Sequence, residues 1–297
     1  MGRQVSEIVI AAPAATLRER AVKYIRNFAR RKPLGFVSVL VLLFMVLVAV
    51  FADVITPYDP KASEAGRLET PSLRHPMGSD DSGRDLLSRV IAGSRISLSV
   101  GFTAVLIGTT LGSLLGIISG YFGGLFDLVF QRVMDAIQTI PLIVLAITLV
   151  AILTPSIANV TGVLAFGLLA RSSRIARGSV IGIKESQYVE AAKAIGVSTL
   201  RMLLRYIIPN VMAPIIVVAS VTLGSTIIAE SSLSFLGLGV PPPAISWGML
   251  LGSSGRQHMV EAPWIAILPG FAITITVLSF NLLGDAIRDV LDPRLRS

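Results

Sequence analysis

The chain has 297 residues, of which 53% are hydrophobic and only 15% are charged. Soluble domains carry a charged share of about 25%, so this composition favours an integral membrane protein. The net charge of +8 is also typical of nucleic-acid-binding proteins, but here the basic residues lie between long apolar runs, and we expect no nucleic-acid partner. Cysteine is absent, which excludes disulfides and thiolate metal sites.

Apolar stretches long enough to cross a membrane follow one another along the chain. A bilayer core about 30 Å thick requires about 20 helical residues, and residues 34–52 and 96–126 each meet this length. Residues 136–170 are too long for one span, and Thr154-Pro155-Ser156 predicts a turn that divides them into two. With residues 206–229 and 262–284, the pattern predicts an all-α integral membrane protein with six transmembrane helices.

The distribution of lysine and arginine predicts how these helices are oriented. Cytoplasmic loops carry most of the basic residues of a membrane protein. With a cytoplasmic N-terminus, 19 of the 26 basic residues lie in cytoplasmic segments. The largest outer loop, residues 53–95, offsets its basic residues with seven acidic ones. We therefore predict that both the N- and the C-terminus are cytoplasmic.

The start of the chain admits alternative interpretations. Residues 1–33 are basic and are expected either to lie as an interfacial helix on anionic lipid or simply to anchor the topology. The first span could also be a cleaved signal peptide, because Val50-Phe51-Ala52 resembles a processing site. Its basic region and its apolar run are both longer than those of signal peptides, which favours a retained helix.

An amphipathic segment ends the first outer loop. Its apolar residues Leu86, Leu87, Val90 and Ile91 share one helical face. We expect this helix to lie on the outer surface of the membrane and to lead into the second span.

The second span carries a ridge of small residues. Glycine recurs at every fourth position, at Gly108, Gly112, Gly116 and Gly120. Such a ridge lets two membrane helices approach closely, and we favour packing within this chain over packing against a second subunit.

Charged residues lie near the start of the third span, at Asp127, Arg132 and Asp135. They could line a pathway, because ionisable groups in a membrane are costly. We favour a structural role, in which Arg132 and Asp135 pair on one helix face.

A short polar helix is predicted in the long cytoplasmic loop, within "YVEAAKAIG" at residues 188–196. Alanines favour a helix with little bulk, which lets a partner protein approach its backbone. Tyr188, Val189 and Ile195 are candidate apolar anchors for that partner, and Gly196 ends the helix. A second amphipathic helix, from Leu200 onward, is expected to lie along the membrane surface until Pro209 turns the chain into the fifth span.

Sequence motifs for catalysis are not found. The chain has no phosphate-binding G-x-x-x-x-G-K-[ST] loop, no G-x-S-x-G elbow and no H-E-x-x-H helix. We therefore expect no enzymatic activity, no metal site and no cofactor bound by this chain.

The segment "EAAKAIGVSTLRMLLRYIIPN" resembles the EAA signature of the membrane subunits of bacterial ABC importers. The matching signature residues are Glu190, Ala191, Ala192 and Gly196. Segments such as "GSDDSGRDLLSRVIAGSRISLSVG", "SSLSFLGLGVPPPAISWGMLL" and "FNLLGDAIRDVLDPRLR" resemble the C-type permeases of the dipeptide, oligopeptide and nickel importer group. One departure is Tyr206, where this group often has histidine.

The resemblance implies a type I ABC importer transmembrane domain and an ordered set of segments. Residues 1–33 are a cytoplasmic segment, residues 34–55 the first helix, residues 56–94 an extracytoplasmic loop and residues 291–297 a cytoplasmic tail. Residues 95–290 form the domain, with a cytoplasmic coupling loop at 171–208 and an extracytoplasmic loop at 230–261. The outer loops, including the proline-rich "VPPPAISWG" with Trp247, are expected to form either an external gate or a reentrant packing element.

The same resemblance implies the partners. These are a second homologous permease, two cytoplasmic ATPases that bind ATP and Mg²⁺, an extracytoplasmic substrate-binding protein and membrane lipid. The residues implied to couple to the ATPases are Tyr188, Val189, Glu190, Ala191, Ala192, Ile195 and Gly196. The location is the plasma membrane of a bacterium or archaeon, which is the inner membrane in a Gram-negative cell.

The implied cargo is a di- or oligopeptide. Nickel chelates, glutathione and other small solutes are alternatives within the same group. A stand-alone secondary carrier or channel is the alternative from another class, but the spans carry few ionisable groups that could couple an ion or form a filter.

Overall fold

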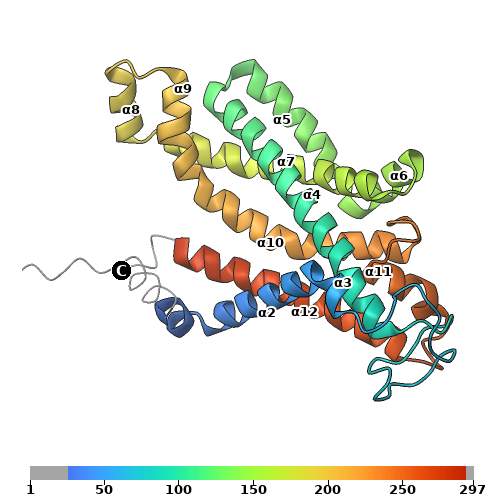
Figure 1. Cartoon of the computed structure of the whole chain (residues 1–297). Coiled ribbons are helices and arrows are strands. Elements are labelled where there is room, and N and C mark those ends of the chain that lie inside the picture. The colour runs from blue at the N-terminus through green and yellow to red at the C-terminus, as the bar shows by residue number, and fades with distance from the viewer. Residues whose placement is uncertain (1–25, 292–297) are drawn as a thin grey trace, which may run out of the picture.

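The computed structural model describes residues 26–291 and shows an all-helical arrangement (Figure 1). The longer helices are α2 (Pro33–Val50), α4 (Leu86–Phe122), α5 (Gly124–Thr139), α6 (Leu142–Leu153), α7 (Ile157–Lys184), α10 (Ile208–Phe235) and α12 (Trp264–Leu291). The shorter segments are α3 (Ala52–Ile55), α8 (Gln187–Ala194), α9 (Thr199–Met202), α11 (Trp247–Leu250) and the π-helical turns η1 (Leu203–Ile207) and η2 (Leu251–Gly255). Most of the predicted N-terminal segment 1–33 and of the tail 291–297 lies outside the described residues.

Four helical stretches are long and apolar enough to cross a membrane. They are α2, α4, residues Thr199–Phe235 and α12. A fifth is added if α5 and α6, which are bent by 89° relative to each other, count as one span. The all-α membrane fold is thus confirmed, whereas the number of six spans and the side on which the termini lie remain predictions.

Proline and the turn residues determine where the middle helices break. Ile140 has an extended backbone, as expected before Pro141, and this residue separates α5 from α6. The sequence analysis did not anticipate this bend within the third predicted span. The predicted turn at Thr154-Pro155-Ser156 is confirmed, because α7 starts directly after it and the Ser156 side chain accepts a 3.0 Å hydrogen bond from the amide of Asn159.

The predicted surface helix before the second span is not a separate element. α4 begins at Leu86 and continues for 37 residues without interruption. Leu86 and Val90 are buried against Trp247 and Leu250, so another part of the protein covers the apolar face that we had assigned to the membrane surface.

The expectation that Pro209 turns the chain is also wrong. α9, η1 and α10 follow one another without a gap, and Pro209 lies in the first turn of α10. The π-helical turn η1 directly precedes it, so the helix passes the proline with a local change in its hydrogen-bond pattern. Leu200 and Leu204 of this stretch are exposed, whereas Ile207 is fully buried.

The glycine ridge of α4 lies against α7. A Cβ atom on Gly108, Gly112 or Gly116 would come within 2.1–2.5 Å of a backbone carbonyl oxygen of α7. These oxygens belong to Ala165, Leu169 and Ser173 in turn, and Gly120 approaches the backbone of Arg177. The two helix backbones are therefore in direct contact, and only glycine fits between them.

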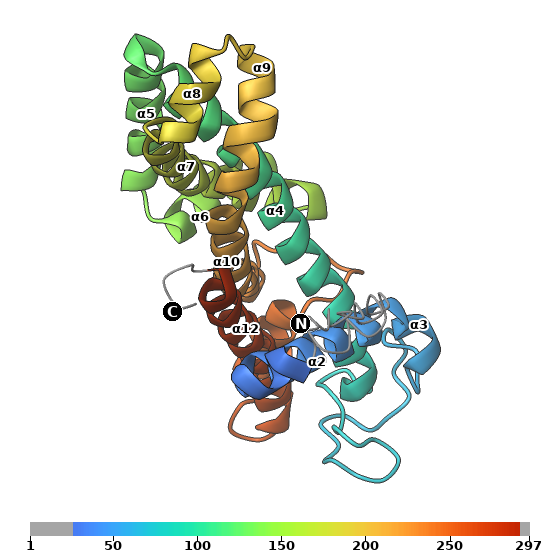
Figure 2. The same cartoon turned by 90° about the vertical axis from the view of Figure 1, so that its left-hand side faces the viewer.

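Different elements lie at the two ends of the molecule. α8 and α9 project at one end, whereas the loop between α3 and α4 lies with α11 at the opposite end (Figure 1 and Figure 2). The start of α2 lies beside the end of α12, where Lys32 and Asp289 form an ion pair. This arrangement keeps the first and last spans side by side.

Candidate functional site

The short helix α8 is held between α7 and α9 by local hydrogen bonds. The backbone carbonyl of Ser186 accepts bonds from the amides of Val189 and Glu190, at 3.0 and 3.1 Å. At the other end Gly196 has a φ of +75°, and the amide of Val197 donates to the carbonyl of Ala192 at 3.1 Å. Glycine is favoured in this left-handed conformation, so the predicted end of the helix is confirmed.

One face of α8 belongs to the core of the protein. Val189 and Ala192 are 0% and 4% exposed. The cluster that they join contains residues of α7 and of the α9–α10 stretch, namely Ala176, Val180, Met202, Ile207 and Val211. Val189 was predicted to anchor a partner protein, and this is wrong, because its side chain is already enclosed by its own chain.

The opposite face of α8 is open. Tyr188 and Ile195 are 45% and 80% exposed, and Glu190 and Ala191 are also exposed. Large apolar side chains on an otherwise polar segment are typical of a surface that another protein covers. The structure therefore divides the predicted coupling residues into an outer set and an inner set, the latter formed by Val189 and Ala192.

The attachment of α8 to the spans is reinforced at the end of α7. The Lys184 ammonium donates a 2.7 Å hydrogen bond to the carbonyl of Tyr121, which lies in the last turn of α4. Because α4 and α7 also pack backbone to backbone, a displacement of α8 would move the two helices together.

The carboxylates of α5 pair with arginines of α7. Asp127 accepts two 2.6 Å hydrogen bonds from Arg177, and Asp135 pairs with Arg174. The predicted pair of Arg132 with Asp135 is therefore wrong, because an arginine on the neighbouring helix reaches Asp135 instead. The structural role that we favoured over a pathway role fits this arrangement, in which the ion pairs join two helices.

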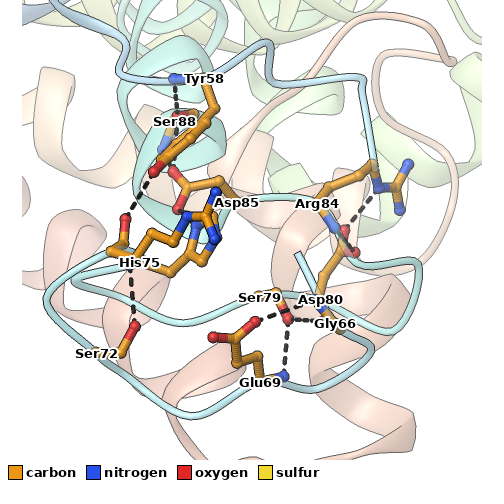
Figure 3. A network of polar contacts seen from close by, with 11 residues as sticks. Tyr58, Gly66, Glu69, Ser72, His75, Ser79, Asp80, Arg84, Asp85 and Ser88 are labelled. Carbon is orange, nitrogen blue, oxygen red and sulfur yellow. Dashed lines mark hydrogen bonds and ion pairs between the residues drawn. The ribbon is translucent and has the colours of Figure 1, made fainter. Parts of the chain in front are cut away.

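The loop between α3 and α4 is built around buried polar groups (Figure 3). His75 and Asp85 are 2% and 0% exposed, and the Nδ1 atom of His75 lies 2.9 Å from Asp85 Oδ1. The other oxygen of Asp85 accepts bonds from the amide and the hydroxyl of Ser88, at 2.8 and 2.7 Å. Asp85 thus caps α4 and ties the loop to it.

Replacing Asp85 with alanine is expected to lower the free energy that holds this loop folded by about 2–3 kcal/mol, because the change removes a helix cap and leaves His75 buried without its partner. Limited trypsin digestion should then cut faster at Arg67 and Arg74, which are exposed in the same loop. Glu64→Ala, at an exposed site, is the control, and trypsin should cut this variant at the wild-type rate. Equal rates in both variants would show that the His75–Asp85 pair does not hold the loop.

Sequence reasoning missed a buried carboxylate in α10. Glu230 was predicted to begin an outer loop, but α10 continues to Phe235 and Glu230 is fully buried. It accepts hydrogen bonds from the hydroxyls of Ser97 and Ser234, at 3.1 and 2.7 Å. The repeated serines in "ESSLS" were the available signal, because a buried carboxylate needs hydrogen-bond donors and serine hydroxyls can supply them.

Trp247 anchors the third predicted outer loop, residues 230–261. It is 1% exposed, its indole Nε1 donates to the carbonyl of Val90 at 2.9 Å, and its amide donates to the hydroxyl of Ser97 at 3.1 Å. Gly248 lies against the backbone of Ser231, so that α11 folds back onto α10. Of the two roles that we considered for this loop, an external gate and a reentrant packing element, these contacts fit the packing element.

Comparison with known proteins agrees with this geometry. The family described as binding-protein-dependent transport system inner membrane component matches residues 112–297, and the N-terminal TM domain of oligopeptide transport permease C matches residues 24–71. A Brucella suis biovar 1 (strain 1330) protein, named for a peptide transport system permease, is 42% identical over 91% of each chain. The glutathione transport system permease protein GsiD of Escherichia coli O1:K1 / APEC is 41% identical over 90% of this chain and 88% of its own.

A solved structure shares the fold. The inward facing MetNI methionine ABC transporter contains a chain that is 15% identical, with a TM-score of 0.58, and the match covers 70% of this chain and 98% of that one. The fold, the apolar helices and the relatives together define a membrane permease subunit of an ABC importer. The chain belongs to the family of binding-protein-dependent transport system inner membrane components, within its peptide and oligopeptide permease group.

Proposed function

We propose that this chain is one of two permease subunits that form a pathway for small peptides through a bacterial or archaeal plasma membrane. An extracytoplasmic binding protein delivers the peptide, and two cytoplasmic ATPases bind ATP and Mg²⁺ and supply the energy. The family membership and the peptide transport name of the Brucella relative support this proposal. Both termini and α8 lie on the cytoplasmic side, in line with the distribution of Lys and Arg.

The ATPases act on this chain through α8. Its outer residues Tyr188, Glu190, Ala191 and Ile195 seat in a cleft of one ATPase, while Val189 and Ala192 connect the helix to α7 and α10. Closure of the ATPase pair would move α8 as a rigid unit and switch the pathway from inward-open to outward-open. The observation that carries this proposal is the division of a single short helix into an exposed apolar face and a face that is built into the core.

Glutathione is the second candidate substrate. GsiD, whose name assigns it to glutathione transport, is as similar to this chain as the Brucella relative is. Glutathione is itself a tripeptide, so the same pathway chemistry serves both candidates.

The test is the purification and reconstitution of the complete importer from its neighbouring reading frames. A tag on this chain should retain a second permease and two ATPases, and proteoliposomes should accumulate labelled tri-alanine or labelled glutathione only with ATP and the binding protein. Uptake by this chain without the other subunits would instead indicate a stand-alone carrier, and accumulation of neither solute would reject the peptide assignment.

A further inference from the structure

A cavity of about 500 Å³ lies at the end of the molecule opposite α8. Its walls come from all three segments that were predicted to be outer loops. Lys61, Arg84 and Arg89 belong to the first, Pro155 to the second and residues 237–249 to the third. The volume is in the range of small-molecule sites.

The lining of this cavity combines cations with apolar residues. Lys61, Arg84 and Arg89 line it, and its described lining residues include no acidic side chain. The rest of the lining is largely apolar and contains the three prolines Pro241, Pro242 and Pro243. A site with a few charged groups beside an apolar wall suits a ligand that is anionic at one end and apolar along its length.

Nearby carboxylates neutralise these cations only in part. The Nε atoms of Arg84 and Arg89 lie 2.8 and 3.4 Å from the same oxygen of Asp80 (Figure 3 shows Arg84 with Asp80). Arg89 is 3% exposed, and its Nη1 donates a 3.1 Å hydrogen bond to the carbonyl of Pro60. Lys61 is exposed and has no ion-pair partner within residues 26–291. Two guanidinium groups therefore share one carboxylate oxygen, and with Lys61 beside them the cavity keeps an excess of positive charge that favours an anionic ligand.

We propose that this cavity binds the carboxylate end of the incoming peptide, with Lys61 and Arg89 as its cationic partners. The inference rests on the proposed function, since every linear peptide with a free C-terminus carries a carboxylate, and glutathione carries two. Asp80 and the carbonyl of Pro60 keep the guanidinium of Arg89 in place. The site would receive the peptide on the delivery side, before the pathway opens toward the cytoplasm.

The first test measures binding without transport. The importer complex in nanodiscs is treated with a small amine-reactive reagent, and the acylation of Lys61 is followed by mass spectrometry relative to that of Lys32, which does not line the cavity. Millimolar tri-alanine should slow the reaction of Lys61, whereas tri-alanine amide should not. Equal protection by both peptides, or by neither, would overturn the proposal. Protection by the binding protein without peptide would overturn it too, because an acidic side chain of that protein would then be the occupant.

The second test uses transport. Lys61→Met should raise the KM for tri-alanine about tenfold, the effect of losing one charged hydrogen bond, and should leave tri-alanine amide unchanged. The control is Arg67→Met, which removes an exposed cation of the same loop that does not line the cavity. An equal loss for both peptides would reject carboxylate recognition. If Lys61 is protected by tri-alanine but no peptide is transported, the site stands and the proposed function fails.

Discussion

Replacing Ala191 with arginine is expected to lower substrate-stimulated ATP hydrolysis by about 100-fold and to release the ATPase subunits during purification. Ala191 lies on the exposed face of α8, so the new side chain does not disturb the core of the permease. In the docked complex it would bury a charge without a partner, which costs several kcal/mol. The measurement is ATPase activity in proteoliposomes with and without the loaded binding protein, together with the amount of ATPase retained by the tagged permease.

A matched control separates docking from folding. Thr70→Arg places the same side chain at an exposed position of the outer loop, far from α8, and should leave both activity and subunit retention unchanged. Normal stimulation of ATP hydrolysis by Ala191→Arg would mean that the outer face of α8 does not contact an ATPase.

Replacing Gly116 with alanine is expected to destabilise the permease by about 3 kcal/mol or to prevent its accumulation in the membrane. A Cβ atom at this position would lie 2.1 Å from the backbone oxygen of Ser173, and a backbone atom cannot move aside as the end of a flexible side chain can. α4 and α7 would have to separate along their contact, which is an overpacking cost. The midpoint of thermal unfolding in detergent, measured by size-exclusion chromatography of heated samples, should fall accordingly.

Gly178→Ala is the control for this substitution. Gly178 lies in α7, and no atom lies within 4 Å of a Cβ built there. Because alanine favours helix over glycine, this variant should be as stable as the wild type or up to about 1 kcal/mol more stable. A Gly116→Ala variant that unfolds at the wild-type temperature would show that the helices do not touch at the ridge.

Both variants probe parts of one mechanical path. In the proposed mechanism, Ala191 lies at the contact with the ATPase, and the ridge of α4 is the contact through which a movement of α7 would reach the rest of the bundle. The two variants should therefore differ in their defects: Ala191→Arg leaves a stable permease that no longer stimulates ATP hydrolysis, whereas Gly116→Ala lowers the stability of the fold.

The class of fold and the position of α8 could be predicted from the sequence alone. The length of an apolar run follows from the thickness of the bilayer, and the ends of α8 follow from local residue preferences, with Gly196 adopting the left-handed backbone that glycine favours. The Thr154-Pro155-Ser156 turn was predictable for the same reason. Each of these features depends on residues that are close together in the chain.

Which residues face which neighbour could be seen only once the helices were packed together. Val189 looked as suitable an anchor as Ile195, and its burial became visible only when α7 and α10 were placed beside it. The hydrogen bond of Glu230 with Ser97 spans 133 positions. The cavity that Lys61 lines is built by residues from three segments that are far apart along the chain. Helical periodicity reports the faces of one helix, but it carries no information on which distant segment covers each face, because that depends on how the helices pack together.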